Sequence, residues 1–397
     1  MNKLTIRDIE VRDKRVLVRV DFNVPLDEKT GSIVDDNRIR ATLPTIKYLL
    51  DLDARVILAT HLGRPDGKVD DKLRVTVVAQ RLSQLLGKQV GVTKNCIGAE
   101  TEKSVGALRS GDVLLLENLR FHSAEERDSP VFARALARLA DVYVNDAFGT
   151  SHRSHASIVG VSEHLPAVAG FLLERELNTL GSILENPARP FAALLGGAKI
   201  SDKVRMVENI LPRVDSLLVG GGMAATFFRA SGREVGLSLI EEHSLETASD
   251  LMAKAADGGV RLVLPVDVIV ADDIEAETGV MTVPIEKIAP TQRIADIGPQ
   301  TMEAFYEELR KCRTIFWNGP MGVYERPRFA EGTRAMAKLL ASSQAATIIG
   351  GGSTAEIVTN MGLAEKMTFV STGGGASLSF LGGESLPGVE ALLSNKP

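Results

Sequence analysis

The sequence predicts an α/β protein with two parallel β-sheets. Short runs rich in Val, Ile and Leu recur along the 397 residues and alternate with stretches whose apolar residues have helical spacing. These runs are apolar at nearly every position, as strands buried on both faces are, and alternation of strand and helix is typical of parallel sheets. A chain of this length suggests about two to three domains, so we expect two such sheets.

The elements follow from these two patterns in chain order. Apolar runs predict strands in the first half at 15–22, 54–62, 112–119 and 141–148, and in the second half at 190–197, 216–222, 261–270, 314–319, 346–352 and 367–375. Helical spacing predicts helices at 38–51, 75–87, 202–214, 244–259 and 335–343.

The boundary between the two sheets is predicted near residues 164–190. The segment FLLERELNTLGSIL (171–184) has the apolar spacing of one helix, and the proline-bounded ENPARP ends it. We interpret this helix as joining an N-terminal lobe at 1–170 to a C-terminal lobe at 185–380. The alternative is a surface helix within one domain.

Composition narrows the class of protein. A net charge of −5 argues against a nucleic-acid or anionic-membrane protein. The two cysteines, Cys96 and Cys312, have no metal-ligand spacing and are expected to be reduced thiols. The N-terminus has no apolar signal core, and no apolar run approaches the ~18 residues of a membrane span. We therefore expect a soluble cytoplasmic enzyme.

Glycine runs mark the second half. They stand at four predicted strand-to-helix junctions, at 193–204, 217–228, 347–358 and 369–380. A glycine-rich turn that enters a helix exposes N–H groups where the helix dipole is positive, and both features bind phosphate. One such run is usually only a tight turn, but four favour a nucleotide polyphosphate site. Lys199 and Lys203 follow the first run and could neutralise a transferring phosphoryl group.

The motifs around the glycine runs restrict which kind of nucleotide site this can be. Two runs fit GxGxxA, but an acidic residue at the end of the next strand, as a dinucleotide site needs, is not found, and GxxxxGK[ST] is absent. Glu325, which follows the turn WNGP, could accept hydrogen bonds from ribose hydroxyls. An exposed structural turn is about as good an explanation of that motif alone.

Basic residues mark the first half. Asp21 and Asn23 end one predicted strand and could hydrogen-bond a hydroxyl group. Guanidinium groups bind phosphate and carboxylate bidentately. The basic or polar residues placed at strand ends or nearby turns are Arg38, His61, Arg64, Arg120 and Arg153. Together they predict a site for a small, doubly anionic ligand.

The residues alone thus suggest a two-lobed phosphoryl-transfer enzyme, with a nucleotide on one lobe and a small anionic acceptor on the other. Two alternatives stay open. One is an NAD-dependent dehydrogenase, although this sequence does not contain the acidic ribose-binding residue that such an enzyme needs. The other is a non-catalytic two-lobed anion-binding protein, which leaves the paired lysines unexplained.

Across nearly its whole length the chain resembles the phosphoglycerate kinase family. The matching motifs are RVDFNVP, HLGRP, ENLRFH, GTSHRSHAS, LGGAKISDK, GGGMA, WNGPMGVYE, IGGGST and STGGGAS, in the family's order and spacing. The resemblance implies reversible transfer of the acyl phosphate of 1,3-bisphosphoglycerate to MgADP, which gives 3-phosphoglycerate and MgATP. It also implies a monomer of two Rossmann-like lobes with 171–184 as a hinge helix, and a tail at 381–397 that packs back on the N-terminal lobe.

The resemblance also implies roles for single residues. Arg38, Lys203, Gly351 and Gly374 would be catalytic. Phosphoglycerate would be bound by Asp21, Phe22, Asn23, Arg38, His61, Leu62, Gly63, Arg64, Arg120 and Arg153. The nucleotide would be bound by Gly197, Ala198, Lys199, Lys203, Gly221, Gly222, Asn318, Pro320, Glu325, Gly350, Gly351, Gly352, Ser353 and Thr354.

One position departs from the family's pattern. Many members have an aspartate that helps to hold Mg²⁺ where this chain has Ser353. A hydroxyl group is a weaker cation ligand than a carboxylate, and Mg²⁺ readily keeps its waters. We therefore expect Mg²⁺ to be carried by the ADP or ATP near Ser353, with no direct protein ligand assigned.

Overall fold

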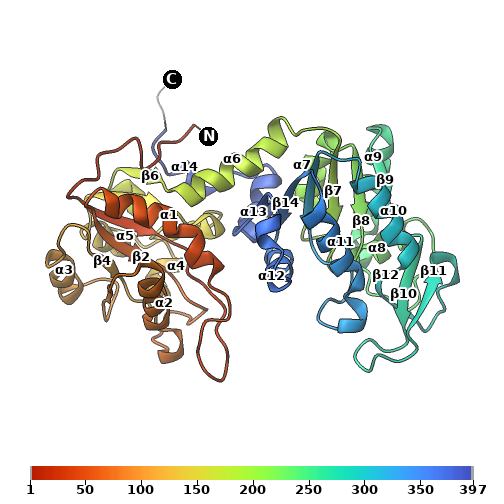
Figure 1. Ribbon diagram of the computed structural model, residues 1–397, viewed down its shortest axis with the longest axis horizontal. Coiled ribbons are helices and arrows are strands. Elements are labelled where there is room, and N and C mark those ends of the chain that lie inside the picture. The colour runs from red at the N-terminus through yellow and green to blue at the C-terminus, as the bar shows by residue number, and fades with distance from the viewer. Residues whose placement is uncertain (1, 395–397) are drawn as a thin grey trace. The chain divides into compact units, whose positions relative to one another are not determined.

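The computed structural model describes residues 2–394, and contacts divide the chain into unit 1 (Met1–Asn178 with Ser385–Pro397) and unit 2 (Thr179–Glu384). Each unit contains a six-stranded sheet in which every pair of strands is parallel (Figure 1). The predicted fold class is confirmed. Residue 1 and residues 395–397, which belong to the predicted N-terminal lobe and tail, lie outside the described residues.

Unit 1 has the strand order β3-β4-β2-β1-β5-β6. Its strands are β1 (Arg15–Arg19), β2 (Arg55–Ala59), β3 (Val90–Val92), β4 (Val113–Leu115), β5 (Val142–Asn145) and β6 (Ala167–Ala169). Its helices are α1 (Asn37–Asp51), α2 (Thr76–Leu86), α3 (Ala99–Gly106), α4 (Ser123–Glu126), α5 (Pro130–Ala137) and α14 (Pro387–Glu390). The edge strands β3 and β6 are three residues each and were not predicted, because runs this short carry little pattern.

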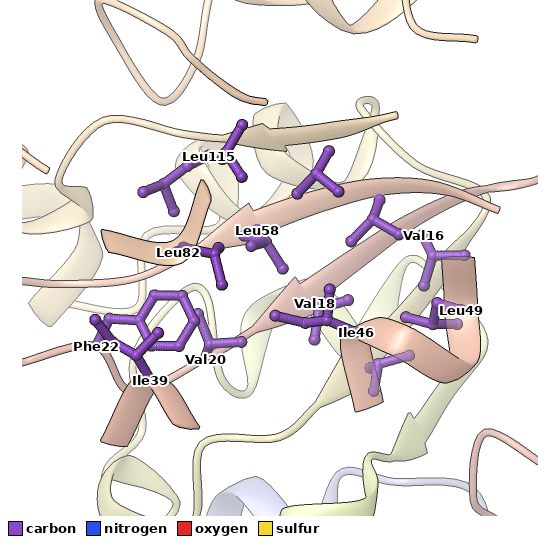
Figure 2. Packing of buried hydrophobic residues seen from close by; sticks show 14 of the residues in the cluster. Val16, Val18, Val20, Phe22, Ile39, Ile46, Leu49, Leu58, Leu82 and Leu115 are labelled. Atoms are coloured by element: carbon purple, nitrogen blue, oxygen red, sulfur yellow. The ribbon is translucent and has the colours of Figure 1, made fainter. Parts of the chain in front are cut away.

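The core of unit 1 explains why its strands are apolar throughout. Alternate residues of β1, such as Val16 and Val18, are fully buried in one cluster with Ile46 of α1 and Leu82 of α2 (Figure 2). Successive side chains of a strand point to opposite faces, so Arg19 lies on the other side of the sheet. That face is buried too, since Arg19 is 1% exposed. Only the ends of such strands can present groups to a ligand.

Helix α6 (Phe171–Glu185) contains the division between the units, which falls after Asn178. Its first turn is capped by Asp146, whose Oδ1 accepts hydrogen bonds from the N–H groups of Leu172 (2.8 Å) and Leu173 (3.2 Å). These bonds satisfy N–H groups that have no acceptor within the helix. The start of α6 is thus attached to the end of β5.

The C-terminal segment returns to unit 1. Leu4 donates its N–H to the carbonyl oxygen of Leu393 (2.8 Å), and Leu393 donates to Ala167 of β6 (2.9 Å). Gly388 of α14 donates to Ser151 (2.9 Å) in the loop after β5. Residues 385–394 therefore hold the N-terminus and this loop together, whereas 375–381 form helix α13 of unit 2.

Unit 2 has a parallel sheet in the order β15-β14-β13-β7-β8-β9 and a second, antiparallel sheet in the order β11-β10-β12. The parallel strands are β7 (Phe191–Leu195), β8 (Ser216–Val219), β9 (Arg261–Val263), β13 (Thr314–Asn318), β14 (Ala346–Gly350) and β15 (Phe369–Val370). The antiparallel strands are β10 (Asp267–Ala271), β11 (Met281–Pro284) and β12 (Arg293–Ile297). The helices are α7 (Val204–Ile210), α8 (Met223–Ala230), α9 (Leu245–Asp257), α10 (Pro299–Leu309), α11 (Glu331–Ser342), α12 (Gly352–Asn360) and α13 (Gly375–Leu381).

The single strand predicted at 261–270 is wrong. The run forms two strands in two different sheets, β9 in the parallel sheet and β10 in the antiparallel sheet. Pro265 stands between them, and proline has no N–H with which to continue a ladder of hydrogen bonds. The apolar composition of the run concealed this break.

Across the part of the chain that the structure describes, no helix has the length and apolar character that crossing a membrane would need.

Three glycine turns of unit 2 pack backbone against backbone after the neighbouring strands β13, β7 and β8. Gly197 donates its N–H to the carbonyl oxygen of Pro320 (2.8 Å), and Gly221 donates to Met321 (2.9 Å). A methyl group added at Gly319 would lie 2.3 Å from the carbonyl oxygen of Gly196, and the φ of Gly319 is +96°. The turns can meet this closely only because they lack side chains.

We predict that Gly319→Ala destabilises the protein by at least about 2 kcal/mol more than Gly259→Ala, because the added methyl overpacks a rigid backbone contact. Gly259 is the matched control, since its φ is +68° but nothing lies within 4 Å of an added methyl group. The control should show only the cost of a left-handed backbone, about 1–2 kcal/mol. Denaturant unfolding measures both; equal losses would contradict the packing explanation.

Candidate active-site regions

The carboxyl ends of four neighbouring strands carry the predicted anion-binding residues of unit 1. Strands β4, β2, β1 and β5 are adjacent in that order. The segments that follow them contain Arg120, His61, Asp21 and Arg153, and Arg38 is the second residue of α1. Carboxyl ends of parallel strands share one edge of the sheet, which is where α/β proteins bind ligands.

Two contacts shape the loop after β1. The guanidinium group of Arg38 forms an ion pair with Asp21, which is buried while Arg38 is one-third exposed. The Oδ1 atom of Asn23 accepts a hydrogen bond from the N–H of Gly63 in the loop after β2 (2.8 Å). Asp21 therefore directs Arg38, and Asn23 ties the β1 loop to the β2 loop.

His61 is surrounded by positive charge. Burial lowers the pKa of its imidazole well below the ordinary value, and the charges of Arg19, Arg120, Arg38 and Arg153 lower this pKa further. His61 is therefore uncharged at neutral pH. Three of these four charges, those of Arg120, Arg38 and Arg153, belong to predicted anion-binding residues, and positive charge concentrated in this way attracts anions.

Arg120 is the most buried of the predicted arginines. It is 4% exposed, its guanidinium donates to the carbonyl oxygen of Gly63 (3.0 Å), and its Nε lies 3.3 Å from Glu126. Burial lowers the pKa of its guanidinium; Glu126 opposes this shift, and the nearby Arg153 adds to it. An anion placed between these guanidinium groups would relieve their mutual repulsion.

The other predicted residues of unit 1 are placed differently. The side chain of Arg64 is exposed, and Arg153 donates from its Nε to Nε2 of His152 (3.3 Å). Phe22 and Leu62 are buried within the hydrophobic core. These two support the loops and leave only their backbone to meet a ligand.

Sequence reasoning missed two buried polar residues. The Oδ1 atom of Asn118 accepts hydrogen bonds from the N–H groups of Leu62 (3.2 Å) and Arg120 (3.1 Å), so Asn118 holds both loops. Arg19 is buried beneath His61, with one guanidinium nitrogen 3.3 Å from its Nδ1. A charged residue inside an otherwise apolar strand was the available signal for Arg19.

Unit 2 contains a pocket of about 460 Å³ beside the three packed glycine turns. Six predicted nucleotide-binding residues line it: Gly197, Ala198, Gly221, Gly222, Pro320 and Glu325. The N–H groups of Gly197 and Gly221 already donate to carbonyl oxygens of the adjoining turn. These two glycines therefore shape the pocket floor, and their N–H groups do not form the expected phosphate cradle.

The apolar wall of this pocket was missed. Leu237 and Leu239 line it and are 53% and 60% exposed, and apolar side chains that are exposed together at a pocket can mark a binding site. Ile274 and the β12 segment with Arg293 also line the pocket. These residues lie on loops and on the antiparallel sheet, where no motif indicated a ligand. An apolar pocket with few polar groups suits a flat heterocyclic ring.

The two predicted lysines differ in setting. The side chain of Lys203 reaches back over the first glycine turn, with its Nζ 3.3 Å from the position of a β-carbon on Gly197. Burial lowers the pKa of its ammonium group, and the carboxylates of Asp202 and Glu241 oppose this shift. Lys199 is exposed. A half-buried ammonium group beside a pocket is suited to an anionic ligand, because the ligand would replace lost hydration.

The glycine run after β14 begins helix α12. The φ of Gly351 is +87°, and Gly352 and Ser353 are exposed in the first turn, where N–H groups have no acceptor within the helix. The Oγ1 atom of Thr354 is buried and accepts a hydrogen bond from the N–H of Gly319 (2.7 Å). Thr354 therefore faces the protein interior, and 351–353 offer backbone groups to solvent, whereas Gly350 is buried as the last residue of β14.

The last two predicted positions are Asn318 and Gly374. Asn318 is buried at the end of β13, and its amide nitrogen lies 2.6 Å from the position of a β-carbon on Gly351. A side chain at position 351 would therefore clash with Asn318. Gly374 has a φ of +52° and precedes α13, with open space around it.

No group of three or more His, Cys, Asp or Glu side chains that could hold a metal ion occurs between residues 2 and 394. Ser353, the position that departs from the family's pattern, is exposed. A divalent ion that arrives bound to nucleotide oxygens and water fits this donor set, because Mg²⁺ commonly keeps several waters and needs few protein ligands.

Comparison with known proteins gives one consistent result. The profile of the family described as phosphoglycerate kinase matches residues 6–384. The protein named phosphoglycerate kinase from Moorella thermoacetica is 53% identical, and the match covers 99% of this chain and 99% of that protein. The protein of the same name from Pelotomaculum thermopropionicum is 52% identical, and the match covers 99% of this chain and 100% of that protein.

Solved structures agree. The phosphoglycerate kinase of Coxiella burnetii is 40% identical with a TM-score of 0.87, and that of Pyrococcus horikoshii is 34% identical with a TM-score of 0.86; each match covers 98% of both chains. Neither the dehydrogenase nor the non-catalytic binding protein receives support from these matches. The chain belongs to the phosphoglycerate kinase family and is an enzyme that transfers phosphate.

Proposed function

We propose that the protein reversibly transfers the acyl phosphate of 1,3-bisphosphoglycerate to MgADP. In the ATP-consuming direction, the carboxylate of 3-phosphoglycerate attacks the γ-phosphorus, the bond to the bridging oxygen breaks, and ADP leaves with the electron pair. No proton is transferred and no side chain acts as a nucleophile. Positioning and charge stabilisation are then the tasks of the protein.

The observation that carries this proposal is that Arg38, Arg120 and His61 lie at or beside the carboxyl ends of adjacent strands, with Arg38 directed by Asp21 and Arg120 bonded to Gly63 of the loop after β2. A phosphoglycerate carries a phosphate and a carboxylate, and both match the guanidinium fork. Arg120, Arg153 and Arg64 would bind the phosphate that is not transferred, with Arg64 turning in from the surface. Arg38, directed by Asp21, would lie near the reacting carboxylate.

The nucleotide would occupy the pocket of unit 2. Its base would lie against Leu237 and Leu239, and its ribose would lie near Glu325. Lys203 would follow the transferring phosphoryl group from beside the glycine turn. The exposed first turn of α12, and the turn at Gly374, would supply N–H groups to phosphate oxygens. Mg²⁺, bound to the nucleotide, would neutralise phosphate charge.

The two sets of residues belong to different units, so transfer requires the units to close on their ligands. We propose that α6 and the loops beside it act as the hinge. The expected result is a smaller radius of gyration by small-angle scattering when both 3-phosphoglycerate and MgATP are present than with either alone. A radius that does not change with both ligands would refute closure.

We further propose that the enzyme acts as a monomer in the cytoplasm, as the resemblance to its family implies. Both cysteines are buried free thiols, which is compatible with a reducing compartment.

The central test of the function is ATP consumption with and without 3-phosphoglycerate in a coupled assay. We expect strict dependence on 3-phosphoglycerate.

Replacing Arg38 with alanine should raise the activation barrier of phosphoryl transfer by about 3–4 kcal/mol and leave nucleotide affinity nearly intact. Arg40→Ala is the matched control, because Arg40 lies on the same helix and pairs with Asp36 instead (2.8 Å). Near-normal turnover of the Arg38→Ala variant would show that Arg38 has no catalytic role.

A second variant tests the metal. Ser353→Asp should lower the Mg²⁺ concentration needed for half-maximal activity, since a carboxylate binds Mg²⁺ more strongly than a hydroxyl group. Ser353→Asn is the control of equal size without charge. If a Mg²⁺ titration gives the same midpoint for both variants and the unaltered protein, position 353 is remote from the ion.

A further inference from the structure

A buried polar network lies beneath the arginine cluster of unit 1, and no predicted role includes it. Arg19 is 1% exposed. Its Nε donates to Oγ of Ser157 (2.8 Å), one terminal nitrogen donates to the carbonyl oxygen of Val20, and the other lies 3.3 Å from Nδ1 of His61. A buried guanidinium group normally needs a carboxylate to offset its charge.

The offsetting carboxylate is reached through Ser157. Within residues 2–394, Arg19 makes no direct ion pair with an acidic side chain, but Ser157 donates its hydroxyl hydrogen to Oε1 of Glu125 (2.5 Å). The N–H of Ser157 donates to the other carboxylate oxygen (2.9 Å). Glu125 is fully buried. Its two oxygens both accept, and the single hydroxyl hydrogen is committed to it. Burial raises the pKa of the Glu125 carboxyl group, and the charge of Arg19 and the two hydrogen bonds from Ser157 oppose this rise.

The contacts that run from Glu125 through Ser157 and Arg19 to His61 form what we call the relay. Ser157 and Glu125 hold Arg19 in place, and the donor character of Arg19 determines how His61 must bond. A hydroxyl group that gives its hydrogen to Glu125 can only accept from Arg19, and an arginine has donors alone. The nitrogen of His61 that faces Arg19 must therefore accept, so Nδ1 carries no hydrogen and Nε2 does.

Asp21 is the competing partner for Nδ1. Its Oδ1 lies 3.9 Å from that nitrogen, beyond hydrogen-bonding distance, and the carboxylate is engaged by Arg38. A hydrogen on Nδ1 would point at the guanidinium group of Arg19, and two donors that face each other cannot form a hydrogen bond. Hydrogen-bond geometry therefore favours the Nε2–H tautomer, and burial together with the surrounding arginines keeps the pKa of the ring low enough for it to stay uncharged.

We infer that Glu125, Ser157 and Arg19 are positioning residues that hold His61 as its neutral Nε2–H tautomer, so that the ring donates a hydrogen bond to the bound phosphoglycerate. This inference rests on the proposed phosphoglycerate site. A donor without charge lets His61 orient the ligand while the arginines supply the charge. A mobile or flipped imidazole would turn a lone pair toward an anion and repel it.

The unaltered protein gives the first test. Long-range ¹H–¹⁵N NMR of histidine-labelled protein distinguishes the two tautomers, and His61→Gln identifies the signal. We expect a protonated Nε2 and an unprotonated Nδ1 in the absence of any ligand. A protonated Nδ1 would overturn the inference directly. This measurement needs no turnover, so its failure is distinct from failure of the proposed function, which would appear as ATP consumption independent of 3-phosphoglycerate.

Variants of the relay give the second test. Ser157→Ala removes the hydroxyl group that joins Arg19 to Glu125. We expect mixed tautomers of His61 and a KM for 3-phosphoglycerate raised about tenfold, the effect of one lost hydrogen bond to a charged group. The KM for ATP should stay unchanged.

Tyr143→Phe is the matched control. The hydroxyl group of Tyr143 donates to the carbonyl oxygen of Ser157 (2.8 Å), so this variant loosens the same buried segment without touching the relay. We expect the tautomer and both KM values to stay as in the unaltered protein. Equal effects of the two variants would reduce the relay to a structural role and overturn the inference.

Glu125→Gln decides the question if Ser157→Ala does not fold, because glutamine keeps the volume, removes the charge and replaces one of the two accepting oxygens with a donor. A shift of the tautomer and of the KM for 3-phosphoglycerate in the same direction supports the relay. An unchanged tautomer together with an unchanged KM contradicts it.

Discussion

Burial of the central strands on both faces is the constraint on which the rest of this structure depends. Strands such as β1, with Val16 and Val18 on one face and Arg19 on the other, have no exposed face on which to place chemistry. Polar groups that contact a ligand can be placed only where the strands end. Parallel pairing brings these ends to one edge of each sheet. The candidate residues of both units are found at strand ends, in the loops that follow them or in the first turn of the next helix.

Under the proposed function, the two units would bind their anionic ligands in different ways. Unit 1 gathers guanidinium groups, and its fold offsets their repulsion with buried carboxylates: Asp21 for Arg38 and, through Ser157, Glu125 for Arg19. Unit 2 uses compact turns. Its glycines at 196, 221 and 319 let three backbone segments touch, and this contact forms one side of a pocket with an apolar wall. Concentrated positive charge would suit a small acid with two anionic groups, whereas an apolar wall with a half-buried lysine would suit a larger nucleotide.

Much of this arrangement could be predicted because it is local in the sequence. Apolar runs indicated the long parallel strands, and strand-end motifs indicated His61, Arg120 and the glycine turns. The antiparallel sheet could not be predicted in the same way, because β9 and β10 form one apolar run and only Pro265 separates them. Leu237 and Leu239 carry no motif, and their role depends on which distant segments they face. The purpose of Gly319 depends on the approach of another turn, which sequence spacing does not report.

The claim at the centre of this account is that each unit binds its own ligand and that the reaction takes place when both are bound. A crystal structure with 3-phosphoglycerate and a non-hydrolysable ATP analogue tests it most directly. The account predicts a phosphoglycerate in contact with Arg38, Arg120 and the Nε2 atom of His61, and a nucleotide base against Leu237 and Leu239. Either ligand bound away from these residues, or a terminal phosphate out of reach of the carboxylate, would contradict it.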